Sequence, residues 1–512
     1  MFCDHSDAAR RVRAKRARAR QRALVVFATI MPRRLLLCIA ILANAFADRP
    51  IRSSDRPILR KPHLVAEADT PQVLVVGKAE LPGSIINLVK AIVGAGVLSL
   101  PVGIAKFSGS RTAIGPACLL MLIVTSLSAY CFGLVARVLE ATGTQSWGDA
   151  WASTVGHGSS WIPSAFVAML CACASLTYTM VIGDSFSAIF AGAGLPAIFA
   201  SRTGAILFIT LLFTLPLSLL PTLEILQVTS FLGIGGILYT AAFMILRIGA
   251  YAPDTALHAA VSAPMRPRFD TAGSDSSLLE ACLSAARSPK IFVLTSIMTT
   301  AMGGSFIAPQ FYNELWGGAS YDGVNSKLPH SKLPRFAVLT FAGFGLSMLL
   351  SGAVMVAGFK TFGAASDGYI LNNYATADAL AQAARLAIGG SIVCTYPILH
   401  QGLRDAALQM LRARGHEPSR ALTSLLLVWV VTVLGVVLTD LGVVAAVMGS
   451  LVSTTLIFTL PALMFAALLS TRQKRAGGRL APSARVELLA ARAIAIMGIA
   501  LAGVGIKAAF SS

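Results

Sequence analysis

The sequence predicts an all-α integral membrane protein with eleven transmembrane helices. Of its 512 residues, 55% are hydrophobic and only 13% are charged, which leaves too little polar surface for a soluble protein of this length. The hydrophobic residues form continuous stretches of about twenty or more, the length that a helix needs to cross a bilayer. These stretches lack the alternation of a transmembrane β-strand, so a barrel is excluded.

Eleven apolar stretches follow one another from residue 84 onward, separated by short polar joints. The longest joint, about 252–289, lies between the fifth and sixth helices and is rich in Pro, Ser and Ala. The predicted helices are 84–106, 113–138, 163–190, 203–221, 226–251, 290–312, 335–359, 378–400, 420–439, 442–470 and 486–509.

The distribution of positive charge predicts the orientation. The net charge is +19, but more than half of the excess precedes residue 62, and much of the rest lies in short loops after helices six, eight and ten. This pattern indicates membrane orientation and argues against a nucleic-acid partner. We therefore expect the start of helix one to face the cytosol or its equivalent, and the C-terminus to face the opposite side.

Residues 1–83 differ from the rest and are expected to form a basic leader, followed by one transmembrane domain over 84–510. From Met31 the leader has a basic region, a short apolar region and small residues, as a signal peptide does. The stretch ANAFADRP is similar to the junction of bipartite signals that direct proteins to complex plastids. A plastid envelope or thylakoid membrane is therefore one expectation, and a vacuolar, other endomembrane or plasma membrane is the alternative. A cleaved secretory signal would place the new N-terminus in the lumen, against the charge bias.

Two of the predicted helices are interrupted by glycines. Helix one contains Gly94, Ala95 and Gly96 at its middle, and helix six contains Gly303 and Gly304. Each glycine costs a helix about 1 kcal/mol relative to alanine, and close packing through small residues is one explanation. Paired interruptions at corresponding places in two halves, however, are typical of transporters built from a five-plus-five inverted repeat. They predict a binding site at the two breaks.

The stretch GSIINLVKAIVGAGVLSLPVGIAKFSG resembles the first helix of the amino acid/auxin permease family, within the amino acid–polyamine–organocation superfamily. The resemblance covers about 84–510 and continues, in the family's order, through SWGDAWASTVG, YTMVIGD, LPLSLL, FYNEL, GFKTFG, ILNNY, TYPILHQGLRD and LIFTLPALM. It implies a LeuT-like fold with broken helices one and six. It also implies amino acid transport driven by protons or sodium.

The resemblance also implies roles for particular residues. The amides near Gly94, Ala95 and Gly96 would bind the substrate carboxylate. The backbone of Gly303, Gly304 and Phe306, together with the Ser305 hydroxyl, would receive the substrate ammonium. Asn87 and Thr395 match positions tied to the coupling cation in sodium-driven members, and their oxygens suit a hard cation. The segment between Phe306 and the following Ala-Pro is shorter than in many members, which puts side-chain selectivity in doubt.

Two charged residues within apolar stretches have alternative roles. Lys90, about a turn before the first break, either extends to the interface or places a charge beside the cation position. Lysine here resembles the proton-coupled branches, and a fixed positive charge would repel Na⁺, so we expect proton coupling. Asp184 in helix three either accepts a proton during transport or holds the structure together.

The sequence does not indicate an enzyme. It lacks HExxH, a P-loop and a nucleophile elbow in the required context, and no cofactor or metal site is expected. The expected partners are a small amino acid and the lipid bilayer. A sodium-coupled symporter of the same fold, or an amino acid sensor without transport, are the alternatives to a proton-coupled transporter.

Overall fold

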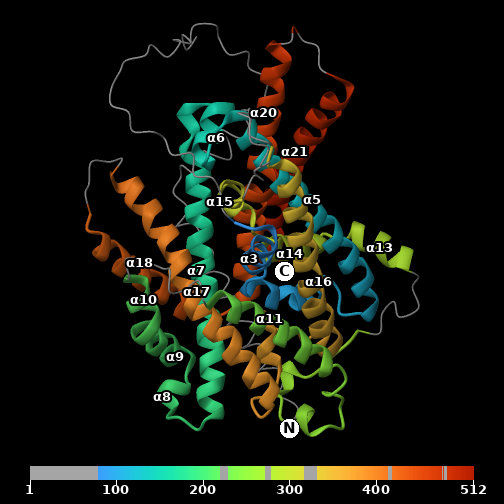
Figure 1. Ribbon diagram of the computed structural model, residues 1–512. Helices are drawn as coiled ribbons and strands as arrows, with labels where there is room; N and C mark the ends of the chain where they lie inside the picture. Colours follow the sequence, from blue (N-terminus) through green and yellow to red (C-terminus); the bar gives the residue numbers. More distant parts are fainter. Residues whose placement is uncertain are drawn as a thin grey trace.

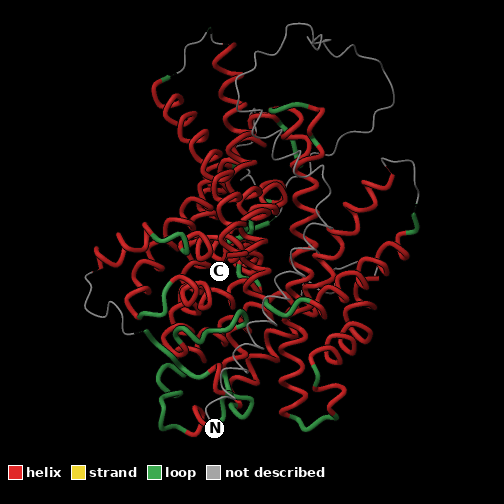
Figure 2. The backbone as a smooth tube through the Cα atoms, turned by 180° about the vertical axis from the view of Figure 1, so that it is seen from behind, coloured by secondary structure: helices red, strands yellow, loops and turns green. Residues whose placement is uncertain are grey.

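The computed structural model describes residues 79–219, 229–270, 278–315, 331–412, 418–475, 477 and 481–511. The predicted leader therefore lies almost entirely outside the described residues. Within them the secondary structure is helical, apart from two isolated bridges, Ala79 with Leu315 and Arg268 with Gly363. Figures 1 and 2 show the helices gathered into one bundle.

Each predicted apolar stretch contains a helix or a run of helices. Among the described residues, eight of these runs are long and apolar enough to cross a membrane, or nine if the bent pair α3 and α4 is one span. The total of eleven stays a prediction. The bounds are α3 (Leu81–Ile92) with α4 (Leu100–Phe107), α5 (Ile114–Thr142), α7 (Trp161–Gly192), α9 (Arg202–Ile209) with α10 (Leu215–Leu219), α11 (Thr229–Leu246), α14 (Ile291–Ala301) with α15 (Ala308–Glu314), α16 (Leu333–Phe362), α17 (Ala379–Arg412), α18 (Arg420–Val437), α19 (Leu441–Val447) with α20 (Leu460–Arg475), and α21 (Pro482–Ser511).

The joints contain short helices that the apolar pattern did not predict. These are α6 (Trp147–Thr154), α8 (Ala197–Ala200), α12 (Ala256–Ala259) and α13 (Leu278–Arg287). α6 begins where the Ser146 hydroxyl accepts a hydrogen bond from the Asp149 amide, which is a helix N-cap. Capping and local polar contacts thus form helices where hydropathy indicates only a connection.

Helix α17 is longer than predicted, because it continues to Arg412 rather than ending near residue 400. It keeps Pro397 within the helix, and its last turns are polar. Hydropathy detects only the part of a helix that lies in lipid, so a polar extension escapes the prediction.

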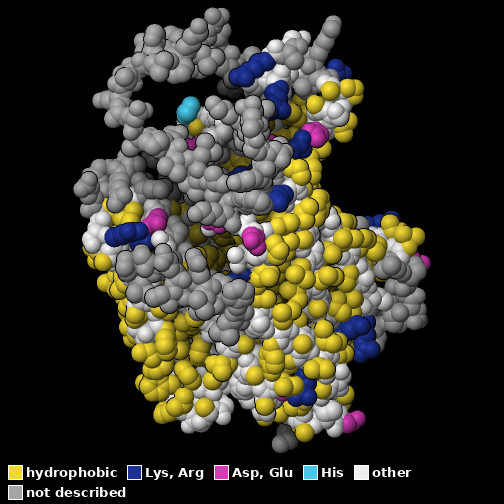
Figure 3. All heavy atoms as spheres, in the orientation of Figure 1, with side chains coloured by type: hydrophobic (Ala, Val, Ile, Leu, Met, Phe, Trp, Pro, Cys, Tyr) yellow, Lys and Arg dark blue, Asp and Glu magenta, His cyan; other side chains and the backbone are white. Residues whose placement is uncertain are grey.

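The bundle has a buried centre and an apolar outside. α17 packs along α7, and α11 packs on α17. The run from α19 to α20 is the most deeply buried of the spans, whereas α9 with α10, α18 and α21 are the least buried. Figure 3 shows hydrophobic side chains over the flank of the molecule. Basic residues gather at the α20–α21 end, where Arg472, Lys474 and Arg475 occupy the last turn of α20.

Candidate functional site

The first helix breaks at the predicted glycines. α3 ends at Ile92, Gly94 is extended (φ −103°, ψ −164°), and a 3₁₀ turn starts at Ala95 and leads into α4. The two parts are bent by 46°. No side chain caps the new start, so the amides of Ala95 and Gly96 begin a helix without a carbonyl from a preceding turn.

The sixth helix breaks at its predicted position as well. α14 ends at Ala301, and the chain resumes as a 3₁₀ turn at Ser305 before α15. The Ser305 side chain is 1% exposed, and its hydroxyl has no hydrogen-bond partner among the described residues. The indole of Trp147 donates to the Phe306 carbonyl at 2.9 Å, so α6 fixes this break from outside.

The two breaks pack directly against each other. A Cβ atom added at Gly304 would lie 2.7 Å from Cγ1 of Ile92, the last residue of α3. A Cβ atom at Gly96 would lie 3.4 Å from Cγ2 of Thr300. The first distance is too short for a side chain, so glycine at position 304 allows the broken helices to approach this closely, whereas the second is an ordinary van der Waals contact. The close approach supplies a second reason for Gly304, beyond the interruption of the helix.

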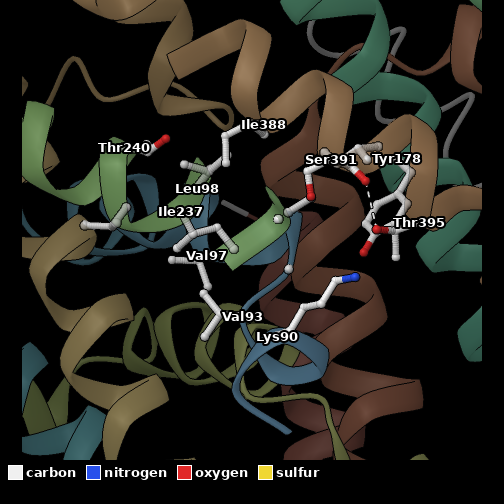
Figure 4. Close-up of a pocket in the computed structure, with 15 residues that line it drawn as sticks. Lys90, Val93, Val97, Leu98, Tyr178, Ile237, Thr240, Ile388, Ser391 and Thr395 are labelled. Carbon is white, nitrogen blue, oxygen red and sulfur yellow. Dashed lines mark hydrogen bonds between the residues drawn. The ribbon is translucent and has the colours of Figure 1, made fainter. Parts of the chain in front are cut away.

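A small cavity lies on the other side of the first break, between α3, α7, α11, α16 and α17 (Figure 4). Its volume is about 40 Å³. One water molecule needs roughly 10–15 Å³ of such space, so the cavity has room for a few water molecules but not for an amino acid. Its lining consists of Lys90, Val93, Gly94, Ala95, Val97, Leu98, Tyr178, Gly233, Ile237, Thr240, Val354, Ile388, Ser391, Ile392 and Thr395.

The polar groups of this cavity are one ammonium and several hydroxyls. Lys90 points toward the side where Tyr178, Ser391 and Thr395 lie (Figure 4), and Thr395 donates a hydrogen bond to the Ser391 carbonyl at 2.8 Å. A Cβ atom at Gly233 would lie 2.7 Å from the Ser391 hydroxyl and 3.3 Å from Cε of Lys90. Gly233 thus leaves the space that Lys90 occupies. No acidic side chain is among the lining residues.

The structure brings some of the predicted site residues together and leaves others apart. Gly94, Ala95, Lys90 and Thr395 line the cavity. Gly96 and the residues from Gly303 to Phe306 do not line it. Asn87 lies on the exposed face of α3 and does not line it either.

Asp184 forms an ion pair away from the cavity. Its Oδ1 lies 2.6 Å from Nε of Arg202, and the same guanidinium donates to the carbonyls of Gly435 and Leu438 at 2.9 and 3.2 Å. The pair therefore ties α7, α9 and the end of α18 together. Of the two roles predicted for Asp184, proton acceptor or structural residue, these contacts support the structural one.

Three further cavity residues are not among the predicted site residues: Tyr178, Thr240 and Ser391. Each carries a hydroxyl group within an apolar stretch. Such residues are common in transmembrane helices, so their presence does not by itself indicate a site. A Cβ atom at Gly94 would lie 3.6 Å from the Tyr178 hydroxyl, so this hydroxyl lies over the first break. Only the crossing of α7 and α3 places it there.

A sequence model of a protein family described as "Transmembrane amino acid transporter protein" matches residues 77–310 and 324–510. A Danio rerio protein named "Putative sodium-coupled neutral amino acid transporter 11" is 25% identical over 401 residues, which cover 77% of this chain and 81% of the relative. A Mus musculus protein named "Sodium-coupled neutral amino acid transporter 7" is 24% identical over 407 residues, 76% of this chain and 79% of the relative.

Among solved structures, the chain is similar to MhsT, which was crystallised in complex with L-phenylalanine. The TM-score is 0.52 at 13% sequence identity, over 84% of this chain and 99% of that chain. At this identity the likeness concerns the fold alone. It confirms the LeuT-like architecture with interrupted first and sixth helices.

Proposed function

Because the chain belongs to the family of transmembrane amino acid transporter proteins, we propose that it moves small amino acids across a membrane by alternating access, with protons as the coupling ion. The chain is an integral multi-pass membrane protein, and its family and named relatives are transporters rather than enzymes. The observation that carries the proposal is the position of Lys90 in the cavity beside the first break.

The substrate would bind as a zwitterion at the two breaks. The amides of Ala95 and Gly96 open a new turn after the extended Gly94, and no side chain caps it, so they suit a carboxylate. The buried Ser305 hydroxyl, which has no partner among the described residues, and the carbonyls near Gly303 suit an ammonium group. The direct packing of Gly304 on Ile92 supports a single site built from both breaks.

The two breaks pack directly against each other, and the adjacent cavity of about 40 Å³ is too small for an amino acid. Transport would therefore require a second conformation in which the breaks separate. We propose that helices one, two, six and seven rock against helices three, four, eight and nine. This motion would open the site to each side in turn.

Lys90 favours protons over sodium as the coupling ion. A sodium ion prefers several oxygen ligands, and the cavity offers the hydroxyls of Thr395 and Ser391. It also holds the Lys90 ammonium and no carboxylate among its lining residues. A positive charge at this place would repel Na⁺, whereas a lysine can exchange a proton.

Sodium coupling is the second candidate, because the relatives are named sodium-coupled neutral amino acid transporters. Thr395 would then be a sodium ligand, and Asn87 would have to rotate from its exposed position toward it. Uptake that depends on Na⁺ and falls in Asn87→Ala and Thr395→Ala would favour this alternative.

The test is uptake by proteoliposomes that contain the purified full chain. Each of the twenty radiolabelled amino acids is offered under an imposed pH gradient and, separately, under an imposed Na⁺ gradient. We expect accumulation of small amino acids with the pH gradient. Accumulation with Na⁺ alone would overturn proton coupling, and no uptake under either gradient would overturn transport.

The membrane is a separate question, because the leader lies almost entirely outside the described residues. We propose a plastid membrane, from the ANAFADRP junction and the orientation of the basic loops. A fluorescent protein fused to residues 1–83 should enter plastids. Its appearance in the secretory pathway would favour a vacuolar, other endomembrane or plasma membrane instead.

A further inference from the structure

A buried arginine lies about one helical turn before the cavity residue Ile388, and nothing in the proposed transport cycle yet uses it. Arg385 belongs to the second turn of α17, within the stretch ALAQAARLAIGG, and it is 1% exposed. Arginine is rarely found in this state, because removing a guanidinium from water costs several kcal/mol unless it is fully paired. Charged residues within a membrane bundle commonly have a functional role.

The guanidinium of Arg385 is only partly satisfied. Its Nη2 donates to the carbonyls of Leu371 and Tyr374, both at 2.7 Å. Nε and Nη1 have no hydrogen-bond partner among the described residues. The two carbonyls belong to the short 3₁₀ turn Ile370–Asn373 and the residue after it, which connect α16 to α17.

No carboxylate is paired with Arg385 in the part of the chain that the structure describes. Two other arginines each have an acid: Arg202 has Asp184 at 2.6 Å, and Arg247 has Asp378 at 2.8 Å. Asp378, the nearest acid to Arg385 along the chain, is therefore already paired with another arginine. Asp367, in the connection before α17, accepts hydrogen bonds from the Tyr369 amide and from Asn372 instead.

The helical period places Arg385 on the same face of α17 as the cavity. Ile388 and Ile392 line the cavity, and they follow Arg385 by three and seven positions, which share one face of a helix. Three residues correspond to about 4.5 Å along the axis. Ile388 lies across the cavity from Lys90 (Figure 4), and Arg385 comes about one turn before Ile388, nearer the start of α17.

We propose that Arg385 is a binding residue for the carboxylate of the arriving amino acid, at the entrance opposite the basic loops. The carbonyls of Leu371 and Tyr374 hold its Nη2 while that entrance is closed. A carboxylate would replace them with a charge-assisted, two-point contact, which is stronger than bonds to neutral carbonyls. The arriving substrate would thereby release the 370–374 connection and open the way to the breaks. This inference rests on the proposed function.

The test measures uptake from each side of proteoliposomes with defined orientation. The probe is L-alanine, or the amino acid that the wild type takes up fastest in the screen of twenty. Arg385→Gln should raise KM at the entrance opposite the basic loops at least tenfold, and leave KM at the other side within about twofold. The KM of Arg385→Lys should lie between those of Arg385→Gln and the wild type, because lysine keeps the positive charge but lacks the planar, two-point donor geometry of the guanidinium. Arg485→Gln, at an exposed position on α21, is the matched control and should change neither side.

The outcomes separate the two proposals. Wild-type protein without uptake under either gradient would overturn the proposed function. Wild-type uptake with an unchanged KM in Arg385→Gln, or an equal KM change on both sides, would overturn the inference alone. If the Arg385→Gln protein does not fold, the Arg385→Lys variant tests the inference. A lower maximal velocity with a wild-type KM in that variant indicates a purely structural residue and overturns the inference.

Discussion

The carboxylate of Asp184 and the guanidinium of Arg202 form an ion pair, with 2.6 Å between Oδ1 and Nε. Their side chains are only 10% and 21% exposed, and Arg202 also bonds to two backbone carbonyls at the end of α18. Asp184 lies in an apolar stretch where a proton carrier was one possibility. In the structure it joins three helices of the bundle that we expect to stay rigid.

The ion pair predicts a stability effect rather than a coupling effect. Arg202→Ala leaves a buried carboxylate unpaired, which costs roughly 3–5 kcal/mol, so the melting temperature of the purified protein should fall clearly. Asp184→Ala combined with Arg202→Ala should recover part of that loss. Asp184→Asn should keep uptake driven by the pH gradient. Loss of that uptake with an unchanged melting temperature would instead identify Asp184 as the proton carrier.

Lys90 is predicted to determine the coupling ion. Lys90→Gln removes the positive charge from the cavity while it keeps a polar side chain of similar length. We expect uptake driven by the pH gradient to fall at least tenfold, and stimulation by Na⁺ to appear. Lys360→Gln, at an exposed position in the last turn of α16, should behave as wild type. A Lys90→Gln protein that retains proton-driven uptake would contradict the proposal.

Gly304 is predicted to keep the two breaks in contact. A Cβ atom there would lie 2.7 Å from the Ile92 side chain, so Gly304→Ala must push the first and sixth helices apart. Uptake should fall at least tenfold, and the double substitution Gly304→Ala with Ile92→Ala should restore part of it. Gly390→Ala is the control, because nothing lies within 4 Å of a Cβ atom at that position. Equal losses for Gly304 and Gly390 would show a general effect of helix packing.

Asp378 predicts how stability changes at acid pH. It precedes α17, its side chain is 0% exposed, and it binds Arg247 at 2.8 Å. Burial raises the pKa of Asp378, but hydrogen bonds from Arg247 and Tyr251 outweigh burial, so the pKa lies below its ordinary value. A lowered pKa means that the ionised form stabilises the fold above the ordinary value, near 3.9, and that this contribution is lost as pH falls through the lowered value.

Melting curves of the wild type and Asp378→Asn provide the measurement. The wild type should be more stable by a constant margin between about pH 5 and pH 8, where the unfolded carboxyl is fully ionised. The margin should shrink below about pH 4. A margin that stays constant down to pH 3 would show that the charge of Asp378 does not contribute.

The sequence alone predicted the apolar stretches and the positions of both breaks. Hydropathy and length are sufficient to predict the apolar stretches, because lipid imposes both on every spanning helix. The glycines are sufficient to predict the breaks, and the chain does break after Ile92 and after Ala301. These properties depend on residues that are close together in the chain.

The tertiary structure alone decided which polar groups meet. Tyr178, Ser391 and Lys90 come from helices far apart in the sequence, and only the crossing of α3, α7 and α17 brings them to one cavity. The same holds for the pairing of Asp184 with Arg202, and for the absence of an acid partner for Arg385 among the described residues. A side chain's partner depends on helix rotation and crossing, and a sequence of nearly uniform hydropathy does not encode these locally.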